Sequence, residues 1–185
     1  KWFVGSLVCL CERYPPHPAA RCVIQMAYQR NRESMHVYQA LNSLVSVTAD
    51  WPHHLRMYLF SGDLETAFDR LSIELVTDSL KWWGIPDLII AALIEENSYQ
   101  HISIEFQGLD VGDNVCFNRC VRTGGKDSAF FWKIAFVFLL APLVECWDVA
   151  KLGVQTAKAS WCHAAWSDNV WLFAQSCADL EKLVV

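Results

Sequence analysis

The chain has 185 residues and a mass of 21.1 kDa, which is enough for one domain with its own hydrophobic core. Hydrophobic residues make up 54% and charged residues 19%, a composition that excludes an intrinsically disordered chain. The net charge of −5 argues against a stand-alone nucleic-acid-binding protein, because such proteins usually present a basic surface.

The charge is divided unevenly along the chain. Residues 1–60 contain six Lys/Arg and three Asp/Glu, whereas residues 61–185 contain nine and seventeen. An acidic metal-binding segment beside a more basic segment would produce this division, and so would ordinary variation over the surface of a soluble domain.

The eight cysteines include no C-x-x-C pair and no Cys/His spacing typical of zinc sites. Buried free thiols are the simplest explanation for cysteines without such a pattern. We therefore expect buried, free thiols and a reducing, intracellular location in the cytoplasm, the nucleus or both.

The N-terminal third is predicted to lead from irregular chain into one helix and one strand. Residues 1–24 are expected to be irregular, because Pro15-Pro16-His17-Pro18 interrupts regular structure. Apolar residues recur at helical spacing over residues 33–48, which predicts an amphipathic helix. The apolar run over residues 57–63 predicts a buried strand that ends at Asp63.

The middle of the chain alternates between helical and strand patterns. In chain order we expect a helix over 72–83 ending at Gly84, a helix over 86–97 beginning at Pro86, and paired strands over 101–106 and 115–121.

Residues 128–147 form the most apolar segment. Only eleven uncharged residues separate Lys133 from Glu145, whereas a membrane span needs about 20. We therefore expect a buried helix, bent near Pro142, rather than a membrane helix.

Two aspartates, 105 positions apart, each follow a strand-like run. Asp63 belongs to the sequence GDLETAFD (62–69), and Asp168 to the sequence WSDN (166–169), which lies between two apolar runs. Carboxylates from distant segments that meet on neighbouring strands hold pairs of divalent cations in enzymes of phosphoryl transfer. Taken singly, Asp63 is better explained as a strand-end carboxylate, and residues 167–169 as a simple hairpin turn.

A glycine turn lies between the two aspartates. Residues 121–131 read VRTGGKDSAFF, a turn that opens the apolar helix predicted from residue 128. Backbone amides at such a turn and helix start are able to face phosphate groups. A hairpin turn without any ligand explains Gly124 and Gly125 equally well.

These three segments, in this order, resemble the reverse transcriptase domain of non-LTR retrotransposons over about residues 27–183. Asp63, Ala67, Phe68 and Asp69 match that family's D-x-x-x-A-F-D signature. Residues 121–131 resemble its R-Q-G-x-x-x-S-P-x-L-F segment, with Thr123 in place of glutamine and Ala129 in place of proline. Residues 166–169 stand where the family has aromatic-x-Asp-Asp, with Asn169 in place of the second aspartate.

The resemblance implies a set of functional residues. Asp63, Asp168 and Asn169 would form the catalytic group, and two Mg²⁺ ions, with Mn²⁺ as a substitute, would bind Asp63, Asp168 and the carbonyl of Leu64. Nucleotide contacts would come from Phe68, which matches the residue that closes on the sugar 2′ position, and from Arg122, Gly124, Lys126 and Ser128. Solvated surface charge is the alternative explanation for Arg122 and Lys126.

The implied activity is RNA-directed DNA polymerisation. The implied partners are an RNA template, a DNA primer, deoxynucleoside triphosphates and the remainder of a longer retroelement polyprotein, with no membrane. The motif departures, the acidic charge and the absence of a recognisable thumb segment lead us to expect negligible polymerase activity from this chain in isolation.

The fold class implied by the resemblance is α+β. We expect a polymerase palm over residues 61–185, in which helices back a small antiparallel sheet, and partial fingers with an N-terminal helical region over residues 1–60.

Two other interpretations remain open. Ser167-Asp168-Asn169 also resembles a variant of the metal-binding hairpin in viral RNA-dependent RNA polymerases, although that class prefers an acidic residue where Phe68 stands. A decayed, non-enzymatic retroelement remnant or interaction module is the third interpretation, and in it Asp63 and Asp168 need not converge.

Overall fold

The computed structural model describes residues 2–29, 31–52, 56–98, 101–102, 105–107, 109–110, 115–116, 125, 127–155 and 160–184. Contacts divide the chain into two compact units, each built from two separate stretches of sequence. The first unit comprises Lys1–His17 and Thr66–Ala135, and the second comprises Pro18–Glu65 and Phe136–Val185. The described elements mix helices with small antiparallel sheets, in agreement with the predicted α+β class.

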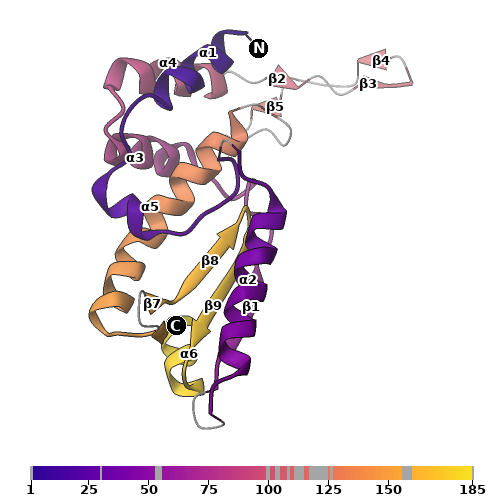
Figure 1. Cartoon of the computed structure of the whole chain (residues 1–185). Coiled ribbons are helices and arrows are strands. Elements are labelled where there is room, and N and C mark those ends of the chain that lie inside the picture. Colours follow the sequence, from indigo (N-terminus) through magenta and orange to yellow (C-terminus); the bar gives the residue numbers. More distant parts are fainter. Residues whose placement is uncertain are drawn as a thin grey trace. The chain divides into compact units, whose positions relative to one another are not determined.

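The second unit is built around a three-stranded antiparallel sheet with strand order β1-β9-β8 (Figure 1). β1 (Tyr58–Asp63) pairs with β9 (Asn169–Ala174), and β9 pairs with β8 (His163–Trp166). A separate two-stranded sheet, β6 (Val154–Gln155) with β7 (Ser160–Trp161), lies just before β8 in sequence. Strands far apart in the chain therefore become neighbours.

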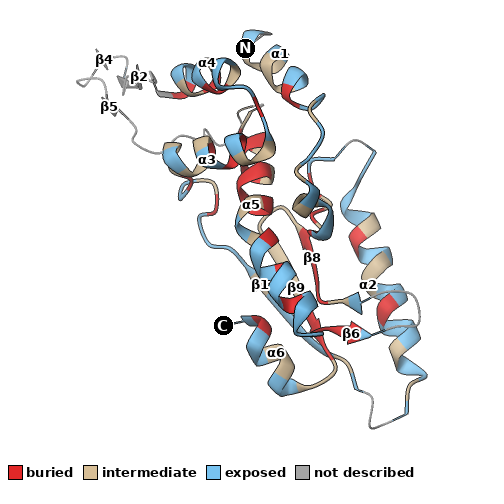
Figure 2. Ribbon diagram, turned by 90° about the vertical axis from the view of Figure 1, so that its left-hand side faces the viewer, coloured by how far each residue is buried: buried red, intermediate tan, exposed pale blue. Residues whose placement is uncertain are grey.

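Helices cover the sheet of the second unit on both faces. Leu44 of α2 (Ser34–Ala49) packs with Ala164 and Phe173, which lie on one face of the sheet. Trp147, near the end of α5 (Ser128–Val149), contacts His163, which points to the other face because side chains alternate along a strand. β8 is accordingly buried over most of its length, as its red colour in Figure 2 shows.

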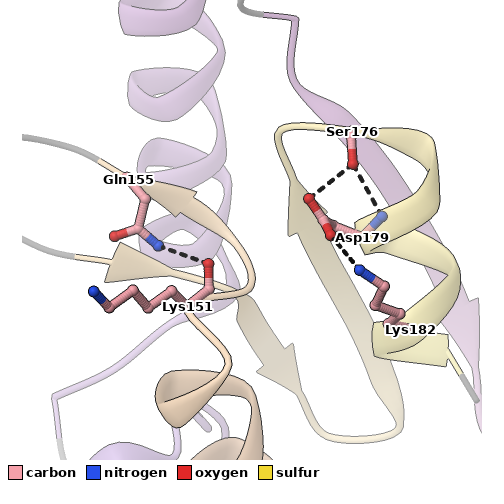
Figure 3. Close-up of polar contacts among 5 residues, drawn as sticks. All are labelled: Lys151, Gln155, Ser176, Asp179 and Lys182. Carbon is pink, nitrogen blue, oxygen red and sulfur yellow. Dashed lines mark hydrogen bonds and ion pairs between the residues drawn. The ribbon is translucent and has the colours of Figure 1, made fainter.

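The helix α6 (Cys177–Val184) follows β9 directly and packs against β9 and β1. Ser176 stands before its first residue and accepts a hydrogen bond from the backbone N–H of Asp179 at 3.0 Å (Figure 3). The Ser176 hydroxyl also donates to the Asp179 carboxylate, which forms an ion pair with Lys182 at 2.9 Å. The first of these contacts satisfies one N-terminal amide of the helix and fixes the point at which α6 begins.

The first unit is mainly helical. Its helix α4 (Asp87–Ser98) packs against both α1 (Trp2–Cys11) and α3 (Ile73–Trp83). The Ser72 hydroxyl caps α3 by accepting from Leu75 N–H at 3.1 Å, and Gly84 ends it at a φ of 86°. The short strands of this unit are β2 (His101–Ile102), β3 (Glu105–Phe106), β4 (Leu109–Asp110) and β5 (Val115–Cys116), paired as β2-β5 and β3-β4.

The predicted helices over 33–48, 72–83, 86–97 and 128–147 correspond to α2, α3, α4 and α5. The strands expected over 101–106 and 115–121 are confirmed only as the two-residue pairing of β2 with β5, and residues 117–121 lie outside the described residues.

Among the described residues, α5 is the helix long and apolar enough to cross a membrane on grounds of length and composition. Half of its most apolar stretch is buried inside the protein, and Phe131, Ile134 and Ala135 are at most 1% exposed. This burial favours a core helix, as expected from the charges that limit its apolar run.

The prediction that residues 1–24 are irregular was wrong. The apolar sequence before the prolines forms α1, and a short 3₁₀ helix, η1 (Pro18–Cys22), follows them. Contact with α4 stabilises α1, and periodicity within such a short segment does not reveal a tertiary contact of this kind.

The strand expected before Asp63 is present as β1, but the expectation that it is buried was wrong. Leu59 is 46% exposed and Phe60 is 38% exposed. β1 is one edge of the sheet β1-β9-β8 and no further described segment bridges it, whereas Gln25 bridges the other edge strand, β8. An apolar run indicates that a segment favours a strand, but it does not show whether another element covers that strand.

Six cysteines are free, as expected, but most of them are not buried. Cys11 and Cys162 are buried, whereas Cys9, Cys22, Cys146 and Cys177 are exposed.

Candidate functional site

The end of the sheet brings together the two segments that carry the predicted metal ligands. Asp63 is opposite Asn169 in the last pair of the β1–β9 ladder, and the Leu64 N–H donates to the Asp168 carbonyl at 3.0 Å. In an antiparallel ladder this bond makes Asp63 and Asn169 a closely spaced pair, with Cα atoms about 4.5 Å apart. Residues 105 positions apart in sequence thus adjoin at one sheet end.

Asp168 lies in the tight turn that connects β8 to β9. The strands end at Trp166 and resume at Asn169, which leaves Ser167 and Asp168 as the two turn residues. Ser167 has a φ of 57°, whereas Asp168 has no positive φ, the combination found in type II′ hairpin turns. That first turn position favours glycine, so a serine there carries backbone strain.

A segment from the N-terminal part of the second unit supports this turn. The buried side chain of Gln25, 2% exposed, accepts from the Ser167 N–H at 3.2 Å and donates to the Ser167 carbonyl at 3.0 Å. The same side-chain oxygen accepts from the Ala27 N–H at 3.0 Å. The backbone on either side of Gln25 bonds to Ala165, at 2.8 Å and 3.0 Å, as a short parallel bridge to β8.

Two further side chains hold the supporting segment against the hairpin. The Tyr28 hydroxyl lies 2.7 Å from the Ser167 hydroxyl, and Tyr28 itself has a φ of 58°. At the other end of the segment, the Ile24 N–H donates to Nε2 of His163 at 2.8 Å. The segment is therefore fixed at both ends to β8 and its turn.

His163 is a neutral, buried acceptor. Because Nε2 accepts from Ile24, the ring proton of the neutral imidazole lies on Nδ1, which is 3.2 Å from the Cys162 sulfur. Burial lowers the pKa of His163 from 6.5 to about 4, since the protein interior disfavours the charged ring. Burial likewise raises the pKa of the Cys162 thiol to about 11. These values indicate a structural role for both residues rather than proton transfer near neutral pH.

Asn169 bonds to the neighbouring aspartate. Its side-chain amide donates to the Asp168 carboxylate at 3.4 Å, a long and partly buried hydrogen bond. An aspartate at this position would instead place a second carboxylate directly opposite Asp63 and beside Asp168. The amide therefore reduces charge repulsion in the absence of cations and also reduces the negative charge available to bind them.

The sheet end offers a small set of oxygen donors. Asp63 is exposed, and Asp168 and Asn169 are half-buried, so these side chains are accessible from solvent. Within the described part of the chain, no group of three or more His, Cys, Asp or Glu side chains gathers closely enough to hold a metal ion. Any cation here would take two carboxylates from the protein and complete its coordination with amide or backbone oxygens, water or substrate.

The nucleotide-binding residues predicted from sequence belong to the other unit or lie outside the described residues. Phe68 stacks its ring at a tilt on Trp132, with centroids 5.5 Å apart, and is half-buried. Ser128 is 3% exposed at the first position of α5. Arg122, Gly124 and Lys126 lie outside the described residues, so their roles stay predictions.

Sequence reasoning missed Gln25, Tyr28 and His163. Gln25 precedes the range over which the family resemblance extends, and a single glutamine carries no recognisable pattern. Tyr28 lies just inside that range, residues 27–183, but a single tyrosine likewise carries no pattern.

Comparison with solved structures gives similarity of fold. The chain is similar to part of the telomerase of Candida albicans, which was solved in complex with a TWJ fragment of telomeric RNA. The TM-score is 0.52 and the sequence identity 12%, and the match covers 98% of this chain and 31% of the telomerase chain. Apo telomerase of Candida tropicalis, truncated from its C-terminal domain, is similar with a TM-score of 0.49, 11% identity and coverage of 99% and 35%.

No protein family model matches the sequence, and no curated protein sequence matches it. The chain spans about a third of the length of the telomerases that it matches. At 12% identity the likeness establishes a similar fold and nothing about activity.

Proposed function

We propose that the sheet end formed by β1 and the β8–β9 hairpin is the divalent-cation centre of a reverse-transcriptase-like nucleotidyltransferase. The observation that carries this proposal is the pairing of Asp63 with Asn169, next to Asp168, across neighbouring strands. The fold likeness to part of a telomerase, a polymerase related to reverse transcriptases, supports the same assignment.

The donor set fits magnesium. Mg²⁺ prefers oxygen ligands and is usually bound by one or two carboxylates together with water and substrate phosphates, rather than by a complete cage of protein groups. Asp63 and Asp168 supply two carboxylates, and Asn169 adds a side-chain amide oxygen. The nearest thiol and imidazole of the hairpin, Cys162 and His163, are buried at the other end of β8 and hydrogen-bonded to each other.

Asp63 and Asp168 would hold the two cations, and the Leu64 carbonyl is a further ligand implied by the family resemblance. Bound cations would activate the 3′-hydroxyl of a primer and neutralise the charge of the incoming triphosphate. The protein contributes the spacing: β1 presents one carboxylate at its end, and the hairpin turn presents the other. Preorganised carboxylates need little rearrangement when the cations and substrate bind.

The substrates proposed on this basis are deoxynucleoside triphosphates, a DNA primer and an RNA template. The family resemblance assigns the choice of deoxyribose over ribose to Phe68, because an aromatic ring leaves no space for a 2′-hydroxyl. A viral-type RNA-dependent RNA polymerase, the nearest competing enzyme, would prefer ribonucleotides.

The direct test of this function is metal-dependent nucleotide binding. Isothermal titration of the 185-residue chain with a deoxynucleoside triphosphate, with and without Mn²⁺, should show binding only when Mn²⁺ is present. Asp168→Asn should abolish this binding, whereas Asp50→Asn, which removes an exposed carboxylate of the same unit at the end of α2, should leave it unchanged.

The proposal would be contradicted if the unmodified chain bound the nucleotide equally well with and without Mn²⁺. Binding by Asp168→Asn with the affinity of the unmodified chain would contradict it as well. A preference for the ribonucleotide would instead favour the RNA polymerase alternative, and Phe68→Ala should weaken the discrimination between the two sugars if the reverse transcriptase assignment holds.

A further inference from the structure

We propose that Gln25 is a positioning residue that holds the Ser167–Asp168 turn in the conformation in which Asp168 binds a cation. This inference rests on the proposed function, since it concerns the same cation centre. Its basis is a contact between segments 142 positions apart, and neither the motifs nor the telomerase likeness points to it.

The Gln25 side chain bonds both backbone polar groups of Ser167, as the backbone of a paired strand would. One side-chain amide accepts from the N–H and donates to the C=O of a single residue, at 3.2 Å and 3.0 Å. Both polar groups of Ser167 are thereby occupied by one rigid, planar group. The Gln25 side chain is 2% exposed, so losing these bonds would leave buried polar atoms unpaired.

Ser167 needs such support. Its φ of 57° is costly for a residue with a side chain, and such backbone conformations persist only where the surroundings over-determine them. The Tyr28 hydroxyl, 2.7 Å from the Ser167 hydroxyl, adds a contact from the same supporting segment. Asp168 is the next residue, so the backbone orientation at Ser167 sets the direction from which the Asp168 carboxylate leaves the turn.

The support is itself anchored in the core of the unit. Ile24 bonds to His163 and to Ala165, and Met26 bonds to Ala165, so Gln25 stands on a segment tied to β8 at both sides. A rigid supporting group that acts through a neighbouring residue resembles the outer groups that orient ligands in metal sites. Removing such groups typically weakens metal binding by about 10–100-fold.

The test compares Gln25→Met with the unmodified 185-residue chain. Methionine retains most of the length and volume of glutamine but has no amide to bond with Ser167, so packing is kept while the hydrogen bonds are lost. The matched control is Leu44→Ala, which destabilises the core of the same unit without touching the turn.

Two readouts are measured. The first is hydrogen exchange of the Ser167 amide in metal-free protein, which should become at least about 10-fold faster in Gln25→Met once normalised to global stability. The second is the dissociation constant for Mn²⁺, followed by electron paramagnetic resonance, which should rise by about 10-fold. In Leu44→Ala both quantities should stay close to those of the unmodified chain at a temperature where the variant is folded.

The possible results separate the two proposals. Unchanged Ser167 exchange in Gln25→Met would show that Gln25 does not hold the turn. Faster exchange with unchanged Mn²⁺ affinity would overturn the positioning role while leaving the proposed function intact. If the unmodified chain itself does not bind Mn²⁺, the proposed function fails, and the role of Gln25 in cation binding fails with it.

Discussion

Asp63 and Asn169 face each other as the terminal pair of the β1–β9 ladder, and the amide of Asn169 also donates to Asp168. An uncharged amide thus stands between two carboxylates that come from opposite parts of the chain. This arrangement lowers electrostatic repulsion at the sheet end.

Replacing this amide with a carboxylate should have opposite effects with and without metal. Asn169→Asp places like charges directly opposite each other, which costs roughly 0.2–1 kcal/mol and should lower the melting temperature by up to about 4 °C in the presence of chelator. With millimolar Mg²⁺ the variant should gain more stability than the unmodified chain, because cation binding to the folded state shifts the equilibrium. Differential scanning calorimetry under both conditions measures this, and an equal response to Mg²⁺ in the two proteins would count against a cation site here.

The stability of the protein should decrease as the pH falls from 6.5 towards 4. The pKa of His163 is about 4 in the folded state and 6.5 ordinarily, so the unfolded state takes up a proton first. The stability contributed by neutral His163 is therefore fully present above pH 6.5 and is lost as the pH falls to about 4. The loss amounts to about 3 kcal/mol.

The variant His163→Gln isolates this contribution. Glutamine is able to accept from the Ile24 N–H but does not titrate, so its free energy of unfolding should vary less with pH over this interval. Urea denaturation at several pH values provides the comparison, and superimposable pH profiles for the two proteins would refute the assignment.

Two glycines should respond differently to alanine. Gly153 has a φ of 101°, and a Cβ added there would lie 2.6 Å from the Trp161 carbonyl oxygen and 2.9 Å from the Cys162 Cα. Gly153→Ala should therefore cost at least about 2 kcal/mol, because both the backbone conformation and fixed backbone atoms oppose it.

Gly62 is the matched control. A Cβ there would approach the Phe60 ring at 2.7 Å, but Phe60 is 38% exposed and is able to turn away. Thermal unfolding of the two variants should show a large decrease for Gly153→Ala and a small one for Gly62→Ala. Equal decreases would mean that the close approach at Gly153 is relieved by movement of β7.

The features predicted well from sequence are those in which local signals and packing agree. The helix that became α3 has a serine cap at its start and a left-handed Gly84 at its end, and both are encoded by residue type. The family resemblance predicts that the segments carrying Asp63 and Asp168 adjoin, and the β1–β9 register places Asp63 opposite Asn169, the residue after Asp168.

The features that sequence did not predict depend on contacts between distant segments. Leu59 and Phe60 are exposed although β1 pairs with β9 and packs against α6, so their exposure depends on the neighbours that the fold supplies rather than on residue type. Gln25 is an ordinary polar residue until the fold brings Ser167 to it. The division into domains at residue 60 stays a prediction. Each of the two compact units is built from two separate stretches of the chain.

The most direct test of the cation centre is a Mn²⁺ titration of the unmodified chain, Asp63→Asn and Asp168→Asn, followed by electron paramagnetic resonance. If the sheet end is a cation centre, the unmodified chain should bind Mn²⁺ saturably and Mg²⁺ should compete, whereas both variants should lose binding while their far-ultraviolet circular dichroism is unchanged. Binding of Mn²⁺ by either variant with the affinity of the unmodified chain would contradict this assignment.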